Sequence, residues 1–143
     1  MHKPFYTHSL FLIWFLLLVL IAVLHLVALE YFLYWVYTWF DILMHFLGGL
    51  FIALSILWFV FESGYVHVAR TVNHAVLVAG LSIFFVGVGW EIFEVIAGIP
   101  IEDNFVFDTI TDLTMDACGA AVGIIIFNAV YLRDIQHIHG EEK

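Results

Sequence analysis

Residues 107–123 read FDTITDLTMDACGAAVG, with three aspartates at four-residue intervals followed by two glycines that are also four residues apart. The five are Asp108, Asp112, Asp116, Gly119 and Gly123. An α-helix turns about 100° per residue, so we expect all five on one stripe roughly 80° wide. The residues around them are apolar enough for a membrane, where ionisable groups are costly and usually face a partner, a cavity or a metal. The stripe therefore predicts a polar functional face on a membrane helix.

The composition of the whole chain supports this class. Of its 143 residues, 64% are hydrophobic and 12% are charged, and the mean hydropathy is +1.07. Soluble domains have about 25% charged residues. We therefore predict a multi-pass integral membrane protein with a single domain over residues 1–143. The net charge of −9 argues against nucleic acid as a partner. The apolar composition makes membrane lipid the expected partner.

Four apolar runs are long enough to cross a hydrocarbon core of about 30 Å. They cover approximately residues 9–29, 42–61, 74–97 and 109–132. Because backbone groups in lipid must be satisfied internally, these runs predict an all-α bundle of four transmembrane helices. The aromatic segment 30–41 is typical of the headgroup boundary. Whether it extends the first helix or lies along the interface is left open by the sequence.

The basic residues predict the orientation of the bundle. Lys3, Arg70, Arg133 and Lys143 are all the Lys and Arg in the chain, and four spans place them on one side. The positive-inside rule makes that side cytoplasmic, so we expect both termini in the cytoplasm. The acidic residues of the spans and of their other connections then lie at or toward the opposite face.

The helical stripes of the last three spans carry polar side chains at a similar depth from that opposite face. At 1.5 Å per residue, His45, Glu91 and Asp116 lie about 6, 9 and 10 Å inside their spans. Small residues on the same stripes mark the sides on which helices approach closely. We place on these stripes the following glycines: Gly48, with Gly49 beside it, then Gly80, Gly87 and Gly98, and finally Gly119 and Gly123. The polar side chains are therefore expected to converge on one site inside the membrane.

Carboxylates together with one imidazole are suitable ligands for a divalent metal such as Mg²⁺, Mn²⁺ or Zn²⁺. The predicted ligands are Asp41, His45, Glu91, Glu94, Asp112 and Asp116. Several close carboxylates do not all stay ionised in a low-dielectric site without a counter-charge. A metal ion would supply that charge. The alternatives are a network of carboxyl groups that share protons, or a polar core with no ligand at all. His25 joins the site only if the first helix ends near residue 29.

Three motifs carry a family resemblance. They are DILMHFLGG (41–49), WEIFE (90–94) and DLTMDACGAAVG (112–123). They resemble the YjdF-like family of small bacterial inner-membrane proteins of unknown function, and are also similar to the VanZ-like family, which is linked to teicoplanin resistance. Glu94 and Asp116 stand where the VanZ-like pattern expects Gln and Asn, and these acids bring the chain nearer to the YjdF-like pattern. The resemblance implies a bacterial inner-membrane location and a shared site, but no particular reaction.

Three classes of function fit these observations. The first is a metal-dependent hydrolase or transferase that acts on a lipid or a lipid-linked substrate, with His45 or Glu94 as the catalytic base. The second is a proton or cation translocator that uses the carboxylate cluster, for which a homodimer could complete the path. The third is a non-catalytic membrane subunit or assembly factor. The apolar cytoplasmic halves of the last three spans favour a dead-ended site over a translocation path.

Overall fold

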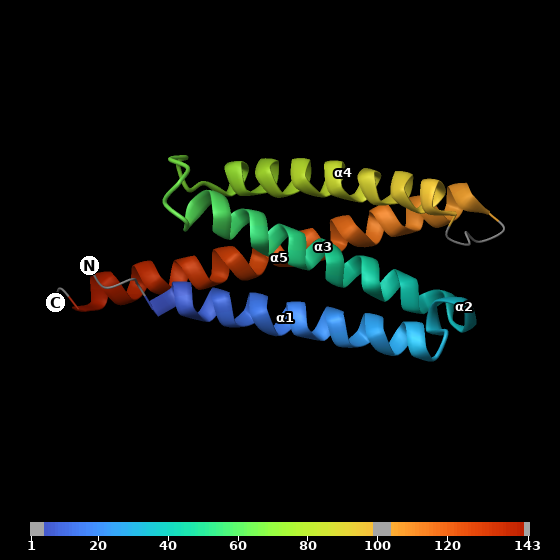
Figure 1. Cartoon of the computed structure of the whole chain (residues 1–143). Coiled ribbons are helices and arrows are strands. Elements are labelled where there is room, and N and C mark those ends of the chain that lie inside the picture. The colour runs from blue at the N-terminus through green and yellow to red at the C-terminus, as the bar shows by residue number, and fades with distance from the viewer. Residues whose placement is uncertain (1–4, 99–103, 142–143) are drawn as a thin grey trace.

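The computed structural model describes the backbone of residues 5–98 and 104–141 and the side chains of residues 10–98 and 104–130; in these ranges its regular structure is entirely helical. Four long helices lie side by side in Figure 1: α1 (Phe5–Glu30), α3 (Thr38–Phe61), α4 (Val72–Ala97) and α5 (Phe105–Glu141). Each is long and apolar enough to cross a membrane. Each also contains one of the four expected spans. The all-α four-helix transmembrane fold is thus confirmed.

The two ends of the bundle differ in what connects the helices. The start of α1, the end of α5 and the connection from α3 to α4 lie at one end, which we call the terminal end (Figure 1). The opposite end, called the α2 end, holds the short helix α2 (Leu33–Val36), the end of α4 and the start of α5. Arg70 belongs to the α3–α4 connection and so lies at the terminal end. The side of the membrane that each end faces stays a prediction.

The aromatic segment after α1 reverses the chain and does not extend the helix. Phe32 adopts a left-handed backbone conformation with φ 56°, and Tyr37 is extended. Between them, α2 forms a single turn before α3 begins at Thr38. The side chains of Trp35, Tyr37 and Trp39 are exposed, as an interfacial position would require. The first helix therefore ends early enough to place His25 at the α2 end.

Glycines lie in the contact between α3 and α5, which is the most extensive contact between helices of the bundle. A Cβ atom on Gly49 would overlap the backbone carbonyl of Asp116, and one on Gly119 would overlap the carbonyl of Phe46. Gly123 lies against Ala53 in the same interface. The expectation for Gly48 is wrong, because no atom lies within 4 Å of its Cβ position. Adjacent residues are separated by about 100° around a helix, so only Gly49 faces α5.

On α4 only one of the expected glycines approaches another helix. Gly87 is buried against α5, whereas Gly80 has nothing within 4 Å of its Cβ position. Gly98 has φ 65° and ends the helix as a left-handed cap, the conformation that glycine adopts at least cost. Of the three, Gly87 alone therefore determines how closely α4 approaches the α3–α5 pair.

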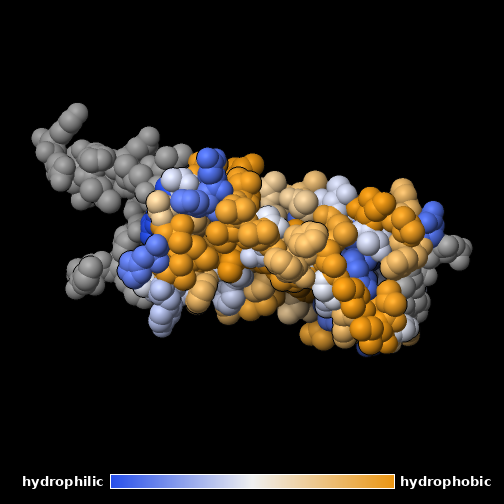
Figure 2. All heavy atoms as spheres, turned by 90° about the horizontal axis from the view of Figure 1, so that it is seen from above, coloured by the Kyte–Doolittle hydropathy of each residue, from blue (hydrophilic) through white to orange (hydrophobic). Residues whose placement is uncertain are grey.

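The interior is apolar toward the terminal end, and the outer surface is apolar along its middle. Leu57, Ala79 and Phe127 belong to one buried cluster contributed by all four long helices. Many large apolar side chains are exposed, including Leu81, Phe84 and Phe85 of α4. In Figure 2, hydrophobic residues dominate the middle of the visible face, and hydrophilic residues gather nearer its ends. Such a surface suits contact with lipid rather than with water.

Candidate metal centre

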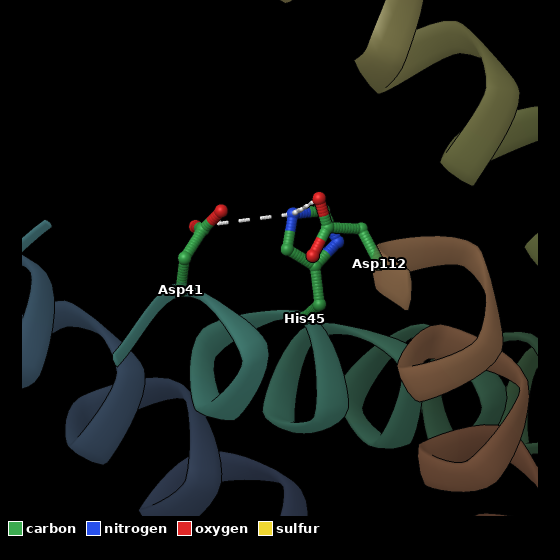
Figure 3. A group of neighbouring side chains, drawn as sticks. All are labelled: Asp41, His45 and Asp112. Atoms are coloured by element: carbon green, nitrogen blue, oxygen red, sulfur yellow. Dashed lines mark ion pairs between the residues drawn. The ribbon is translucent and has the colours of Figure 1, made fainter. Parts of the chain in front are cut away.

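The α2 end contains a cluster of acidic side chains around one imidazole. Asp41 lies in the first turn of α3, and His45 follows one turn later. Asp112 and Asp116 come from α5, also one turn apart. Figure 3 shows Asp41, His45 and Asp112 projecting from their two helices toward a common point. Close packing of α3 against α5 at Gly49 and Gly119 thus brings together residues far apart in the sequence.

The distances in this cluster are suited to an ion between the side chains. The Nε2 atom of His45 lies 3.9 Å from Asp41 Oδ1 and 3.9 Å from Asp112 Oδ2. Both distances exceed the hydrogen-bond limit of about 3.2 Å. Two ligand atoms that each bind a shared ion at about 2.1 Å can be up to about 4.2 Å apart. Both distances from His45 Nε2 are within this limit. One ligand atom from each of the three residues lies within 4.8 Å of the others, so a small closing movement of Asp41 and Asp112 would let the group hold a metal ion.

Asp116 occupies the other side of the imidazole. Its Oδ1 atom is 3.5 Å from His45 Nδ1, and its Oδ2 atom lies 2.9 Å from where a Cβ on Gly87 would be. The absence of a side chain on Gly87 therefore makes room for this carboxylate. Metal-binding histidines usually direct their second ring nitrogen toward a carboxylate or carbonyl, which fixes the tautomer and the ring orientation. Asp116 is positioned for this orienting role toward His45.

The cluster combines deep burial with an excess of acid. The side chains of His45, Asp112 and Asp116 are buried, with Asp112 only 2% exposed, whereas the Asp41 side chain is 34% exposed. Arg70 is the only Lys or Arg whose side chain the structure describes, and it lies at the terminal end. Within the described residues, the carboxylates thus have His45 as their nearby basic group. Bound cations or protons must supply the remaining positive charge.

Glu91 and Glu94 of α4 lie near this group but outside it. The Thr109 hydroxyl of α5 donates a 2.8 Å hydrogen bond to Glu91 Oε2. Glu91 is 7% exposed, and its Oε1 atom is buried with no hydrogen-bond partner among the described residues. Glu94 is half-buried and interacts electrostatically with Asp41. Neither glutamate supplies an atom to the three-residue group, so their roles as metal ligands stay predictions.

Tyr34 and Thr109 are polar residues of this end that the sequence analysis missed. The Tyr34 hydroxyl and His25 Nδ1 are 2.9 Å apart, which links α1 to the edge of the site. Burial, followed by the negative charges of Asp41 and Glu94, raises the pKa of Tyr34 to about 12. The phenol therefore stays protonated at physiological pH. Nothing in the sequence distinguishes Tyr34 from the other aromatic residues of segment 30–41, because its position depends on the turn at Phe32.

Comparison with known proteins agrees with this architecture. Residues 3–133 match a family described as predicted membrane protein (DUF2238). The chain belongs to this family. No curated protein and no solved structure was found to match the chain. The family match supports the resemblance to small membrane proteins of unknown function, and it provides no support for a likeness to VanZ-like proteins.

Proposed function

We propose that this member of the DUF2238 family binds a divalent cation between Asp41, His45 and Asp112. The observation that carries the proposal is the convergence of three potential ligand atoms from α3 and α5 within 4.8 Å of one another. Asp116 supports it by facing the second nitrogen of His45 at 3.5 Å. Mixed nitrogen and oxygen donors suit Mn²⁺ or Zn²⁺, and Mg²⁺ is compatible with the carboxylates.

We further propose that the cation serves a hydrolase or transferase that acts on a lipid or a lipid-linked substrate. A bound cation polarises a phosphoryl or carbonyl oxygen, or activates water. It would also provide the positive charge with which to contact a phosphate at the α2 end. Asp41 is partly exposed, which favours access from that end. Both ring nitrogens of His45 face carboxylates, which favours a ligand role over the role of base. The two glutamates of α4, Glu94 and Glu91, are then the candidate bases.

The apolar interior argues for binding and catalysis over translocation. Buried Leu57, Ala79 and Phe127 belong to the cluster that fills the bundle toward its terminal end. A proton or cation path needs polar side chains or water along its length, because unpaired charge in an apolar interior is very costly. In the part of the chain that the structure describes, the apolar cluster thus favours a site that is reached from the α2 end over a path through the bundle.

Metal analysis of the purified protein tests the cation proposal. After dialysis against a mixture of Mg²⁺, Mn²⁺ and Zn²⁺, elemental mass spectrometry should find about one divalent ion per wild-type chain, as expected for a single three-ligand centre. His45→Ala and Asp112→Asn should lose it. Glu30→Gln is the control, because Glu30 is exposed at the end of α1. A wild-type protein without bound metal, or equal metal content in all four proteins, would contradict the proposal.

A second experiment tests the reaction. Vesicles containing a polyprenyl diphosphate are incubated with the reconstituted protein, and release of inorganic phosphate is followed with and without EDTA. Release that requires the metal, and that Asp112→Asn abolishes while Glu30→Gln retains it, would support a lipid-phosphate hydrolase. Metal binding without release from this lipid would leave the cation site standing and exclude this substrate.

A further inference from the structure

The most informative group outside the three-residue centre is the carboxylate of Glu91. Its Oε1 atom is buried and has no hydrogen-bond partner in the part of the chain that the structure describes. A buried acceptor in this situation is costly, and native proteins nearly always satisfy it with a protein group, a bound water or a ligand. The Oε1 atom of Glu91 therefore indicates that a hydrogen-bond donor belongs at this point.

The carboxylate is held in place rather than free to rotate. Thr109 of α5 donates to its other oxygen at 2.8 Å, so Oε1 has a defined direction. Glu91 follows Gly87 by one helical turn, and Asp116 of α5 enters the space left by the missing Cβ of Gly87. Glu91 also interacts electrostatically with His45 and Asp116. An oriented, buried acceptor thus lies beside the proposed cation centre.

We infer that Glu91 Oε1 accepts a hydrogen bond from a water molecule bound to the cation at Asp41, His45 and Asp112, and that Glu91 is the catalytic base. This inference rests on the proposed function. Glu91 lies outside the group of atoms within ligand range, and one intervening water would bridge it to the ion. Metal-bound water is acidified and becomes the nucleophile once a base removes its proton.

In the proposed hydrolysis, the water would transfer one proton to Glu91 Oε1, and its oxygen would form a bond to the phosphorus or carbonyl carbon of the substrate. The bond from that atom to the leaving oxygen breaks with both electrons on the leaving oxygen. Glu91 then returns its proton to that oxygen, so the carboxylate is regenerated. Thr109 is a positioning residue in this scheme, because it touches Glu91 and not the reacting atoms.

The experiment uses full-length protein in lipid nanodiscs with Mn²⁺ as the probe. Mn²⁺ affinity is measured for wild type, Glu91→Gln, Thr109→Val and Asp112→Asn. Infrared difference spectra of the Mn²⁺-loaded proteins are then compared in H₂O and D₂O. We expect Glu91→Gln and Thr109→Val to retain Mn²⁺ with affinity reduced by no more than about 10–100-fold, the range for residues behind the ligands. Asp112→Asn should lose it. Ionised-carboxylate bands that disappear in Glu91→Gln should shift in D₂O. Part of this shift should remain in Thr109→Val, which lacks the exchangeable hydroxyl, because the remaining shift reports the water.

Several results would overturn the inference. Complete loss of Mn²⁺ from a folded Glu91→Gln protein would make Glu91 a direct ligand. A protonated-carboxyl band that is present in the loaded wild type and absent in Glu91→Gln would show that Oε1 is satisfied by a proton of its own. Glu91 bands that do not shift in D₂O in the Thr109→Val protein would exclude the water. In these three cases Mn²⁺ still binds wild type, so the cation centre survives, whereas a wild type that binds no Mn²⁺ would refute both proposals.

Discussion

The two ends of the bundle each bury acidic side chains but treat them differently. At the terminal end, Glu62 has a side chain only 3% exposed, and Arg70 lies 2.8 Å from its carboxylate. Arg70 also donates to the carbonyl of Phe61, so the guanidinium ties the end of α3 to the following connection. At the α2 end, His45 faces three aspartates at 3.5–3.9 Å.

The two ends differ in how the charge of their carboxylates is balanced. A guanidinium that contacts a carboxylate directly neutralises it and leaves no need for another partner. A single imidazole among several carboxylates carries at most one positive charge, and its distances to Asp41 and Asp112 are longer than hydrogen bonds. The terminal end thus contains an ion pair whose charges balance. At the α2 end, the spacing of the side chains and their excess negative charge favour binding of a cation.

The largest expected effect comes from the helix contact that assembles the α2 end. In Gly119→Ala the new Cβ would overlap the backbone of Phe46, which cannot rotate away, so we expect a loss of about 3 kcal/mol in unfolding free energy together with loss of metal. Gly48→Ala is the control, because its Cβ meets no atom within 4 Å. It should be neutral or stabilising by up to about 1 kcal/mol. Denaturant unfolding in mild detergent measures both, and equal destabilisation would refute the proposed packing.

The second-largest effect is expected from removal of the metal, which should destabilise only proteins with an intact site at the α2 end. A ligand present at 100 times its dissociation constant stabilises a protein by about 2.7 kcal/mol. We therefore expect EDTA to lower the unfolding temperature of the wild type and of Glu62→Gln, but to leave Asp112→Asn unchanged. Thermal unfolding followed by circular dichroism, with and without EDTA, makes the comparison. A response of Asp112→Asn as large as that of the wild type would show that the stabilising ion binds elsewhere.

Breaking the ion pair at the terminal end should have a smaller effect of a different kind. Because Arg70 is partly exposed, we expect Glu62→Gln to cost about 1–2 kcal/mol, between the values for surface pairs and fully buried ones. Its Mn²⁺ affinity should equal that of the wild type, since the change lies at the other end. An affinity change above tenfold would mean that the two ends are coupled.

The smallest effect is expected at the edge of the site. Tyr34→Phe removes the hydroxyl that contacts His25 at 2.9 Å and should cost about 0.5–1.5 kcal/mol, the usual net value of one hydrogen bond. Metal content should stay at the wild-type level, because Tyr34 lies outside the three-residue group. Loss of the ion in this variant would place Tyr34 among the groups that hold it.

The fold class and the types of side chain available to the site follow from local features of the amino-acid sequence. Apolar runs of sufficient length form helices in lipid whatever their neighbours are, because each helix satisfies its own backbone. The four-residue spacing of Asp112 and Asp116, and of Asp41 and His45, likewise fixes the shared helix face of each pair. These features depend on local periodicity, which is why they could be predicted.

Which of these residues come into contact depends on how the helices pack against one another. Selecting Gly49 over Gly48 for the contact with α5 depends on the exact rotation of two packed helices, which periodicity does not determine. That rotation places Asp41 and Asp112 on one nitrogen of His45 and Asp116 on the other. It also leaves Glu91 outside the group, with Oε1 buried and without a partner among the described residues. The positions of these side chains to within a few ångströms depend on how whole helices pack together, so they cannot be predicted from any single segment of the sequence.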